Sequence, residues 1–258
     1  MEVIRSAQNP AIKRARAVGE GKEKGFLLLE GARLVREALQ RRLLVEFCLV
    51  SEESQDLAGE LAASGALVRL AQKDVLARAS QLVTPPGVLA VSAAPPAMAI
   101  GGLNPRKAPL IVVAYEIADP GNLGALARTA EAAGVWAFVA VGGANPWGAK
   151  ALRGSMGSLL RIPVSPQRAG SASAVIAALD SVGYRQVRAA TRDGADYAGF
   201  EWRPSTALWI TSETGELPPD AWGFPGVTIP MAGSVESLNV STAAAVLLFA
   251  ARAAIARR

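Results

Sequence analysis

Apolar and polar positions along the first third of the chain follow two alternating periods, which predict helices and strands in turn. The pattern predicts helices at 10–18, 31–42 and 52–63 and strands at 26–29, 45–50, 66–70 and 88–92. Asn9-Pro10 and Gly31 are typical helix boundaries. Strands that alternate with helices in this way predict a small α/β domain.

The pattern is interrupted between residues 93 and 109. Pro and Gly cluster there, and neither the helical nor the strand period is sustained. Such a composition is typical of a connecting segment. We therefore expect an N-terminal domain over 1–94 and a linker over 95–109.

A second alternating pattern begins at residue 110. Strands are predicted at 110–115, 136–141, 185–190, 207–211 and 227–229, and helices at 123–133, 148–160 (in part), 171–182 and 238–256. Apart from 185–190, which contains two arginines, the strands are continuous apolar runs, which is typical of a parallel sheet covered by helices on both faces. The sequence thus predicts an α/β domain over 110–258.

The amino-acid composition excludes several classes of catalytic and metal-binding site. The 258 residues are 51% hydrophobic and 19% charged, enough for a folded core, and they include no histidine. Serine or cysteine nucleophiles activated by histidine, and zinc sites that contain histidine, are therefore excluded. The single cysteine, Cys48, lies in an apolar run and is expected to be a core residue. We expect no metal site and no internal disulfide.

Two stretches of the sequence indicate where in the cell the protein is expected. The start, at residues 1–5, is charged and lacks the apolar core of an export signal, and the apolar run from Ala243 is interrupted by Arg252. We expect a cytoplasmic protein with no membrane partner.

The positive charge is concentrated at the N-terminus. The net charge of +5 lies wholly within residues 1–42, which contain ten Lys and Arg against five acids. A basic surface of this kind suits a polyanion such as RNA, because Lys and Arg contacts to phosphate supply most of the sequence-independent affinity. A solvated helix surface without a ligand explains the same charge equally well.

Polar residues follow three predicted strands, where open α/β sheets bind ligands. No strand is followed by a G-x-G-x-x-G run or a P-loop, which disfavours dinucleotide and nucleoside triphosphate sites. The first stretch, 119–130, makes a tight turn, offers Asn122 as a helix cap and places Arg128 in the helix. A capped helix with a surface Arg128–Glu131 pair explains this stretch as well.

The other two stretches also carry polar groups. Residues 210–218 place the carboxylate of Glu213 after a strand, and residues 229–241 form a loop of small residues before a long apolar helix. Ser237, Asn239 or Ser241 can cap that helix, yet the loop has more polar residues than a cap needs.

Residues 229–241 read Ile-Pro-Met-x-Gly-x-x-x-Ser-Leu-Asn-Val-Ser. They resemble the signature of the SpoU-type RNA 2′-O-ribose methyltransferases of the SPOUT superfamily. Residues 119–130 resemble motif 1 of that family, 211–216 resemble motif 2, and 145–157 resemble the segment that joins them. The resemblance covers about 110–256. It is weaker in the N-terminal half, where it rests on Ser6, Asn9-Pro10, Lys13 and Glu30-Gly31.

The resemblance implies a trefoil-knotted, parallel-sheet methyltransferase domain after an L30e-like α/β domain that binds the RNA substrate. It implies S-adenosylmethionine as the cofactor, and a homodimer whose active site uses both subunits. The residues that match catalytic positions are Asn122, Arg128, Glu213, Ser237 and Asn239, and those that match cofactor-binding positions are Thr211, Ile229 and Leu238. Motif 2 departs from the family pattern, because three of its glycine positions hold Thr211, Thr214 and Glu216.

The implied reaction is methyl transfer to a ribose 2′-OH, with ribosomal RNA favoured over transfer RNA. Two alternatives stay open: a methyltransferase that acts on a base nitrogen, and a non-catalytic RNA-binding or assembly factor on the same fold. The target nucleotide, and whether the modification serves housekeeping or antibiotic resistance, are left undecided by the sequence.

Overall fold

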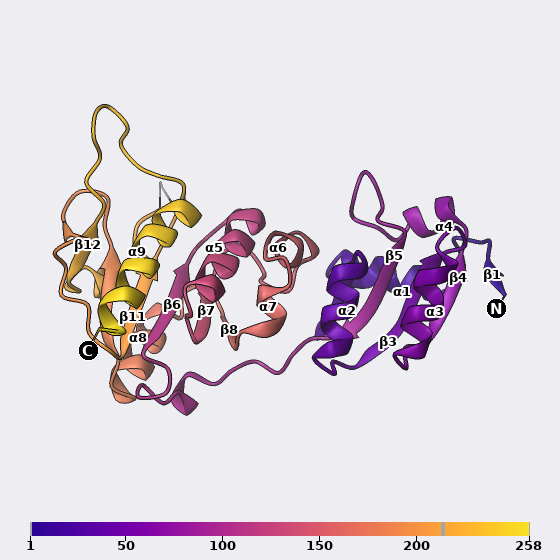
Figure 1. Cartoon of the computed structure of the whole chain (residues 1–258), viewed down its shortest axis with the longest axis horizontal. Helices are drawn as coiled ribbons and strands as arrows, with labels where there is room; N and C mark the ends of the chain where they lie inside the picture. The colour runs from indigo at the N-terminus through magenta and orange to yellow at the C-terminus, as the bar shows by residue number, and fades with distance from the viewer. Residues whose placement is uncertain (1, 213–214, 258) are drawn as a thin grey trace. The chain divides into compact units, whose positions relative to one another are not determined.

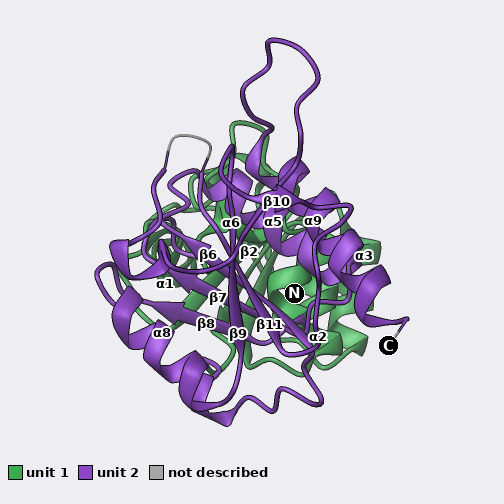
Figure 2. Ribbon diagram, turned by 90° about the vertical axis from the view of Figure 1, so that its left-hand side faces the viewer, with its two compact units in different colours: residues 1–96, 147–161 green, residues 97–146, 162–258 purple. Residues whose placement is uncertain are grey.

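The computed structural model describes residues 2–212 and 215–257, which form two compact units (Figure 2). Unit 1 consists of residues 1–96 and 147–161. Unit 2 consists of residues 97–146 and 162–258. Within the described part of the chain, no helix has the length and apolar character needed to cross a membrane.

Unit 1 is built on a mixed five-stranded sheet (Figure 1). Its elements are β1 (Val3–Ile4), α1 (Pro10–Gly19), β2 (Phe26–Glu30), α2 (Ala32–Gln40), β3 (Val45–Ser51), α3 (Gln55–Ala63), β4 (Val68–Ala71), α4 (Lys73–Ala77), β5 (Val88–Ala93), α6 (Ala149–Gly154) and α7 (Ser158–Arg161). The strand order is β1-β4-β3-β5-β2. Strand β4 runs parallel to β1 and β3, whereas β5 runs antiparallel to β3 and β2.

Helix α1 shows why the predicted pattern folds in this way. The Asn9 side chain accepts a hydrogen bond from the Ala11 N–H, and Pro10 occupies the first helical position, where no N–H donor is needed. Its apolar face, which includes Ile12 and Val18, packs in the core cluster of the sheet. The predicted helix at 10–18 is confirmed, as is the burial of Cys48 in β3.

Residues 147–161 belong to unit 1, although they lie far from its other residues in the sequence. Glu30 has a fully buried side chain, and its carboxylate accepts hydrogen bonds from the Ser80 hydroxyl at 2.7 Å and from Arg153 at 3.4 Å. A buried carboxylate needs such partners because desolvation penalises an unpaired charge. The Glu30–Arg153 pair therefore fixes α6 to β2.

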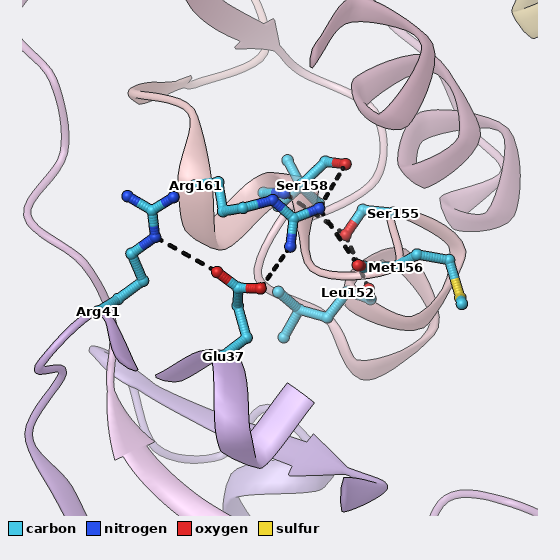
Figure 3. A network of polar contacts seen from close by, with 8 residues as sticks. Glu37, Arg41, Leu152, Ser155, Met156, Ser158 and Arg161 are labelled. Carbon is cyan, nitrogen blue, oxygen red and sulfur yellow. Dashed lines mark hydrogen bonds and ion pairs between the residues drawn. The ribbon is translucent and has the colours of Figure 1, made fainter. Parts of the chain in front are cut away.

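A second carboxylate holds α7. Arg161 donates to Glu37 at 2.6 Å, and Arg41 donates to the other oxygen of the same carboxylate at 3.3 Å (Figure 3). Arg161 also donates to the Ser158 hydroxyl at 3.3 Å and to the Met156 carbonyl at 3.4 Å. Glu37 thus joins α2 to a segment that the sequence analysis assigned to the C-terminal domain.

Unit 2 is built on a wholly parallel seven-stranded sheet. Its elements are η1 (Ile100–Gly102), β6 (Leu110–Tyr115), α5 (Pro120–Ala132), β7 (Ala137–Val141), β8 (Val164–Gln167), α8 (Ala172–Ser181), β9 (Arg185–Ala189), β10 (Ala195–Asp196), β11 (Thr206–Ile210), η2 (Pro219–Ala221), β12 (Gly226–Thr228) and α9 (Val240–Ile255). The strand order is β10-β12-β9-β11-β6-β7-β8, and every pair is parallel. The predicted parallel sheet is confirmed.

The core of this sheet centres on Trp209, which is fully buried in β11. Its indole N–H donates to the Gln186 side chain at 2.9 Å, so the one polar atom of the ring is satisfied. Val113 of β6 and Val139 of β7 belong to the same core cluster. The apolar strands are therefore buried on the sheet as their sequence pattern predicts.

Helices α5 and α9 pack side by side on this unit (Figure 1). The cap of α5 differs from the expectation: Asp119 precedes the first helical residue, Pro120, and its carboxylate accepts from the Asn122 N–H at 2.8 Å. The Asn122 side chain is consequently left for another role. Asn239, one of three candidates, caps α9 by accepting from the Ser241 N–H at 3.0 Å.

Candidate functional site

A cavity of about 520 Å³ lies in unit 2 at the carboxyl ends of three neighbouring strands. Residue Ile210 ends β11, Thr191 follows β9, and Ile229 follows β12. Parallel strands bring their carboxyl ends to one edge of a sheet, so loops from distant parts of the sequence meet there. The cavity is the place where the fold concentrates its polar loops.

All three residues predicted to bind a cofactor line this cavity: Thr211, Ile229 and Leu238. Ser237, which was predicted to be catalytic, lines it as well. Apolar side chains that include Leu217 of the loop and Leu247 of α9 complete the wall. A concave, mainly apolar site with a few polar groups is the usual form of a small-molecule site.

Two polar atoms of the cavity wall lack partners. The Thr211 hydroxyl oxygen and the Arg188 Nε are buried, and neither has a hydrogen-bond partner among the described residues. Buried polar atoms in native proteins nearly always have a partner, because an unsatisfied group costs about 1–3 kcal/mol. These two atoms therefore indicate that a polar ligand belongs in the cavity.

The rest of the Arg188 guanidinium is fixed by Asp193. Its two terminal nitrogens donate to the two Asp193 oxygens, at 3.1 Å and 2.7 Å. This two-pronged hydrogen bond raises the pKa of Arg188 and lowers the pKa of Asp193. The sequence analysis missed both residues. The available signal was the presence of two arginines, Arg185 and Arg188, inside the strand predicted at 185–190.

The motif 2 loop borders the cavity through Gly215. A Cβ at this position would lie 2.7 Å from the Ser212 hydroxyl and even closer to the Thr211 hydroxyl, so no side chain fits without displacing them. Its N–H donates to the Ser212 carbonyl at 3.0 Å. Glu213, predicted to be catalytic, lies outside the described residues, as does Thr214.

Two predicted catalytic residues that are distant in sequence meet between α5 and α9. The Asn239 side-chain N–H donates to the Asn122 side-chain oxygen at 3.1 Å. The Asn239 oxygen is occupied by the α9 cap, which orients the amide and leaves its N–H groups for Asn122. Motif 1 and the signature segment at 229–241 are thereby joined by a direct contact.

Arg128 lies on α5, one and a half turns after Asn122, and is exposed to solvent. It does not line the cavity. Within the described part of the chain, its guanidinium has no ion-pair partner, so its donors face solvent. The structure therefore brings the predicted residues into two groups, the cavity group and the Asn122–Asn239 pair, with Arg128 on the same helix as the second group.

Comparison with known proteins places this geometry in a family. The family model described as the SpoU rRNA Methylase family matches residues 109–249, and the model of an MRM3-like substrate binding domain matches residues 9–90. The chain is 31% identical over 257 residues to the 23S rRNA (guanosine(2553)-2′-O)-methyltransferase RlmP of Bacillus subtilis, covering 96% of this chain and 98% of that protein.

Two solved structures are similar over nearly the whole chain. The AdoMet-bound rRNA methyltransferase from Sinorhizobium meliloti has a TM-score of 0.85 at 26% identity, covering 98% of this chain and 97% of that one. The SpoU methyltransferase AviRb from Streptomyces viridochromogenes, in complex with the cofactor AdoMet, has a TM-score of 0.81 at 25% identity, covering 95% and 98%.

The predicted fold class is confirmed by these likenesses together with the parallel sheet of unit 2. The motif resemblance and the matched family model cover the same part of the sequence. This chain belongs to the SpoU rRNA methylase family.

Proposed function

We propose that the protein transfers a methyl group from S-adenosylmethionine to a ribose 2′-OH of ribosomal RNA. The observation that carries this proposal is the cavity at the carboxyl ends of β9, β11 and β12, with Thr211, Ile229 and Leu238 in its wall. Relatives named as rRNA 2′-O-methyltransferases support the reaction, and AdoMet-bound neighbours support the cofactor.

The cavity suits this cofactor in size and in chemistry. Apolar side chains such as Ile229, Leu238 and Leu247 suit the adenine ring of the cofactor. The Thr211 hydroxyl and the Arg188 Nε, which lack partners among the described residues, suit the polar atoms of the cofactor. Thr211 stands where the family pattern has glycine. We infer that its hydroxyl replaces, by a side-chain hydrogen bond, part of what the glycine-rich loop supplies through its backbone.

When bound, S-adenosylmethionine supplies an electrophilic methyl group on its sulfonium. Thr211, Ile229 and Leu238 would hold the cofactor in the cavity, where it would give its methyl group to the 2′-OH and leave as the neutral thioether, while the hydroxyl proton would pass to solvent. In-line approach of the two groups must be enforced by the protein, so positioning supplies much of the rate.

Arg128 is proposed to hold the phosphate of the target nucleotide. A guanidinium offers two parallel donors to phosphate and is a permanent cation in proteins. It therefore acts here as a fixed positive charge that favours the developing 2′-alkoxide rather than as the proton acceptor. Its exposure on α5 leaves it accessible to RNA.

The remaining catalytic residues are proposed to position the ribose. The Asn122–Asn239 contact fixes the two amides between α5 and α9. Ser237 lines the cavity and lies two residues before Asn239 in the sequence. Glu213 is assigned a similar orienting role from the motif alone.

The RNA substrate follows from the reaction, because only RNA carries a 2′-OH. We further propose a homodimer. Trp136 is 42% exposed and Phe249 on α9 is 46% exposed, and burial against a second copy would remove both from water. The cytoplasmic location expected from the sequence is part of the same proposal.

Calorimetric titration with S-adenosylmethionine, and separately with its demethylated product, tests the cofactor. We expect micromolar binding of both, on the order of −8 kcal/mol. Incubation with ribosomal RNA and methyl-labelled cofactor, followed by digestion to nucleosides, then shows whether the label is on ribose or base. Label on a base nitrogen, or no binding of either ligand, contradicts the proposal, and the second outcome favours a non-catalytic RNA-binding factor.

A further inference from the structure

The wall of the cavity in unit 2 contains a charged pair that the sequence motifs do not include. Arg188 in β9 and Asp193 in the loop after β9 both line the cavity. They lie outside the segments that resemble motif 1, motif 2 and the signature, which are 119–130, 211–216 and 229–241. The motif resemblance therefore assigns this pair no role.

Two glycines make the space in which the pair lies. A Cβ at Gly226 of β12 would lie 3.3 Å from the Arg188 Cζ and 3.0 Å from the Asp193 carbonyl oxygen, so its absence leaves room for the guanidinium. A Cβ at Gly194 would lie 2.8 Å from the Thr228 backbone nitrogen. The loop that contains Asp193 thus packs directly on β12, and this packing holds the carboxylate beside the guanidinium.

The ion pair leaves one nitrogen of the guanidinium without a partner. Asp193 accepts from the two terminal nitrogens of Arg188, and the Arg188 side chain is only 17% exposed. Its Nε is buried and has no hydrogen-bond partner among the described residues. Because a buried N–H without an acceptor is costly, we expect an acceptor atom of a ligand at this position.

The charges of the cavity wall disfavour a carboxylate as that acceptor. Among the described residues that line the cavity, Arg188 is accompanied by three acids, Asp193, Glu216 and Glu236. Glu236 has an exposed ion-pair partner, Arg192, at 3.2 Å. Since Asp193 already neutralises Arg188, a ligand carboxylate at Nε would lie near a second carboxylate, and like charges repel. A neutral acceptor meets no such repulsion.

We propose that the Arg188 Nε donates a hydrogen bond to a neutral acceptor in the adenosine half of S-adenosylmethionine, with Asp193 as the positioning residue. The acceptor is a hydroxyl oxygen of the ribose or a ring nitrogen of adenine. The choice of ligand rests on the proposed function. The adenosine half is the same before and after methyl transfer, so the contact strengthens binding without changing the rate of the bound complex.

The test compares two ligands by calorimetry with the full-length protein. S-adenosylmethionine carries a carboxylate, whereas 5′-methylthioadenosine keeps the adenosine and lacks the amino-acid part. Arg188→Met removes every donor, and Arg188→Lys keeps a positive charge opposite Asp193 if the first variant fails to fold. We expect the affinity for both ligands to fall by the same factor, about ten- to a hundredfold.

Three outcomes would overturn the proposal. A fall for S-adenosylmethionine alone would place the ligand carboxylate at Arg188. Unchanged affinities in both variants would show that Nε binds neither ligand. No binding of 5′-methylthioadenosine by a wild-type protein that binds S-adenosylmethionine would show that affinity depends on the amino-acid end.

Arg203→Met is the matched control. Arg203 also pairs with a carboxylate, Glu201 at 2.6 Å, but it does not line the cavity. Both affinities should stay at the wild-type value, and an equal loss with Arg203→Met would contradict a role specific to Arg188. In methyl-transfer assays, the Arg188 variants should raise KM for S-adenosylmethionine and leave kcat unchanged, because uniform binding is what they lose.

Asp193→Asn tests the positioning role. The freed guanidinium should then attract a ligand carboxylate, so the affinity for 5′-methylthioadenosine should fall more than the affinity for the demethylated product, which has a carboxylate. An equal change for both ligands would remove Asp193 as a positioning residue. Methyl transfer with unchanged affinities in the Arg188 variants would refute this inference alone, whereas Arg188-dependent binding of 5′-methylthioadenosine without methyl transfer would refute only the proposed function.

Discussion

The two sheets of this protein place their polar groups in different ways. In unit 2 every strand is parallel, so the loops after β9, β11 and β12 meet at one edge and enclose the cavity. In unit 1 the strands run in both directions, so their carboxyl ends are divided between two edges. A wholly parallel sheet concentrates chemistry at one edge, whereas the mixed sheet serves as a scaffold for surface charge.

The two units also differ in whether their buried polar groups have hydrogen-bond or ion-pair partners. In unit 1 the buried carboxylate of Glu30 and the partly buried carboxylate of Glu37 each have an arginine partner, and these pairs hold α6 and α7 in place. In unit 2 the Thr211 hydroxyl, the Arg188 Nε and the Trp202 indole N–H are buried without hydrogen-bond partners among the described residues, and the first two line the cavity. The paired carboxylates hold the framework of unit 1, and the two unpartnered atoms of the cavity wall mark the place where a ligand is expected.

The largest expected effect comes from removing a core side chain of the parallel sheet, in strand β11, which ends at the cavity. Trp209→Ala removes a fully buried indole from β11 and leaves Gln186 without its donor, so we expect a loss of about 3–5 kcal/mol in the free energy of unfolding. Urea unfolding followed by circular dichroism measures it. Trp222→Ala, at a largely exposed position, should cost less than half as much; equal costs would mean that β11 is not the centre of the core.

The second prediction concerns the rate of methyl transfer and not the stability of the fold. Arg128→Ala should lower the rate of methyl transfer by about 10²–10³-fold, the usual effect of removing one group that stabilises transition-state charge. Because Arg128 is exposed and does not line the cavity, calorimetric binding of S-adenosylmethionine should be unchanged. Arg106→Ala, another exposed arginine of unit 2, is the control, and near wild-type activity of Arg128→Ala would remove the residue from the catalytic set.

A smaller effect is expected at the edge of the cavity. Gly215→Ala introduces a Cβ that collides with the hydroxyls of Thr211 and Ser212, at a cost of about 1–3 kcal/mol if the loop must move. The affinity for S-adenosylmethionine should fall by about ten- to a hundredfold, as read by calorimetry. Gly199→Ala meets no atom within 4 Å and is the matched control. An unchanged affinity for Gly215→Ala would show that the motif 2 loop does not shape the cofactor site.

The last prediction concerns the reactivity of the Cys48 thiol in the mixed sheet of unit 1, where the smallest effect is expected. Burial raises the pKa of the Cys48 thiol to about 11, so the native protein holds it protonated at neutral and mildly alkaline pH. We expect no alkylation by iodoacetamide under native conditions and rapid alkylation in urea, measured by mass spectrometry. Rapid modification of the native protein would instead reveal a reactive group in unit 1.

Much of the fold follows from local patterns. The strand predicted at 110–115 matches β6, and the helix at 10–18 matches α1 within one residue, because both have sustained periods and clear boundaries. Strand β8 was missed, since it is four residues long and contains Pro166. The cap of α5 was assigned to Asn122 instead of Asp119, because both residue types are good caps and only three residues separate them.

By itself, the sequence determined the parallel α/β architecture, the family, and the placement of Thr211, Ile229 and Leu238 after apolar strands. These depend on residue periodicity and on motifs that are contiguous in the chain. Only the tertiary structure decided that Asn122 contacts Asn239, that Arg188 binds Asp193 beside the cavity, and that residues 147–161 pack with unit 1. Each of these depends on which segments meet after folding, and hydrophobic periodicity specifies that a face is buried without specifying its partner.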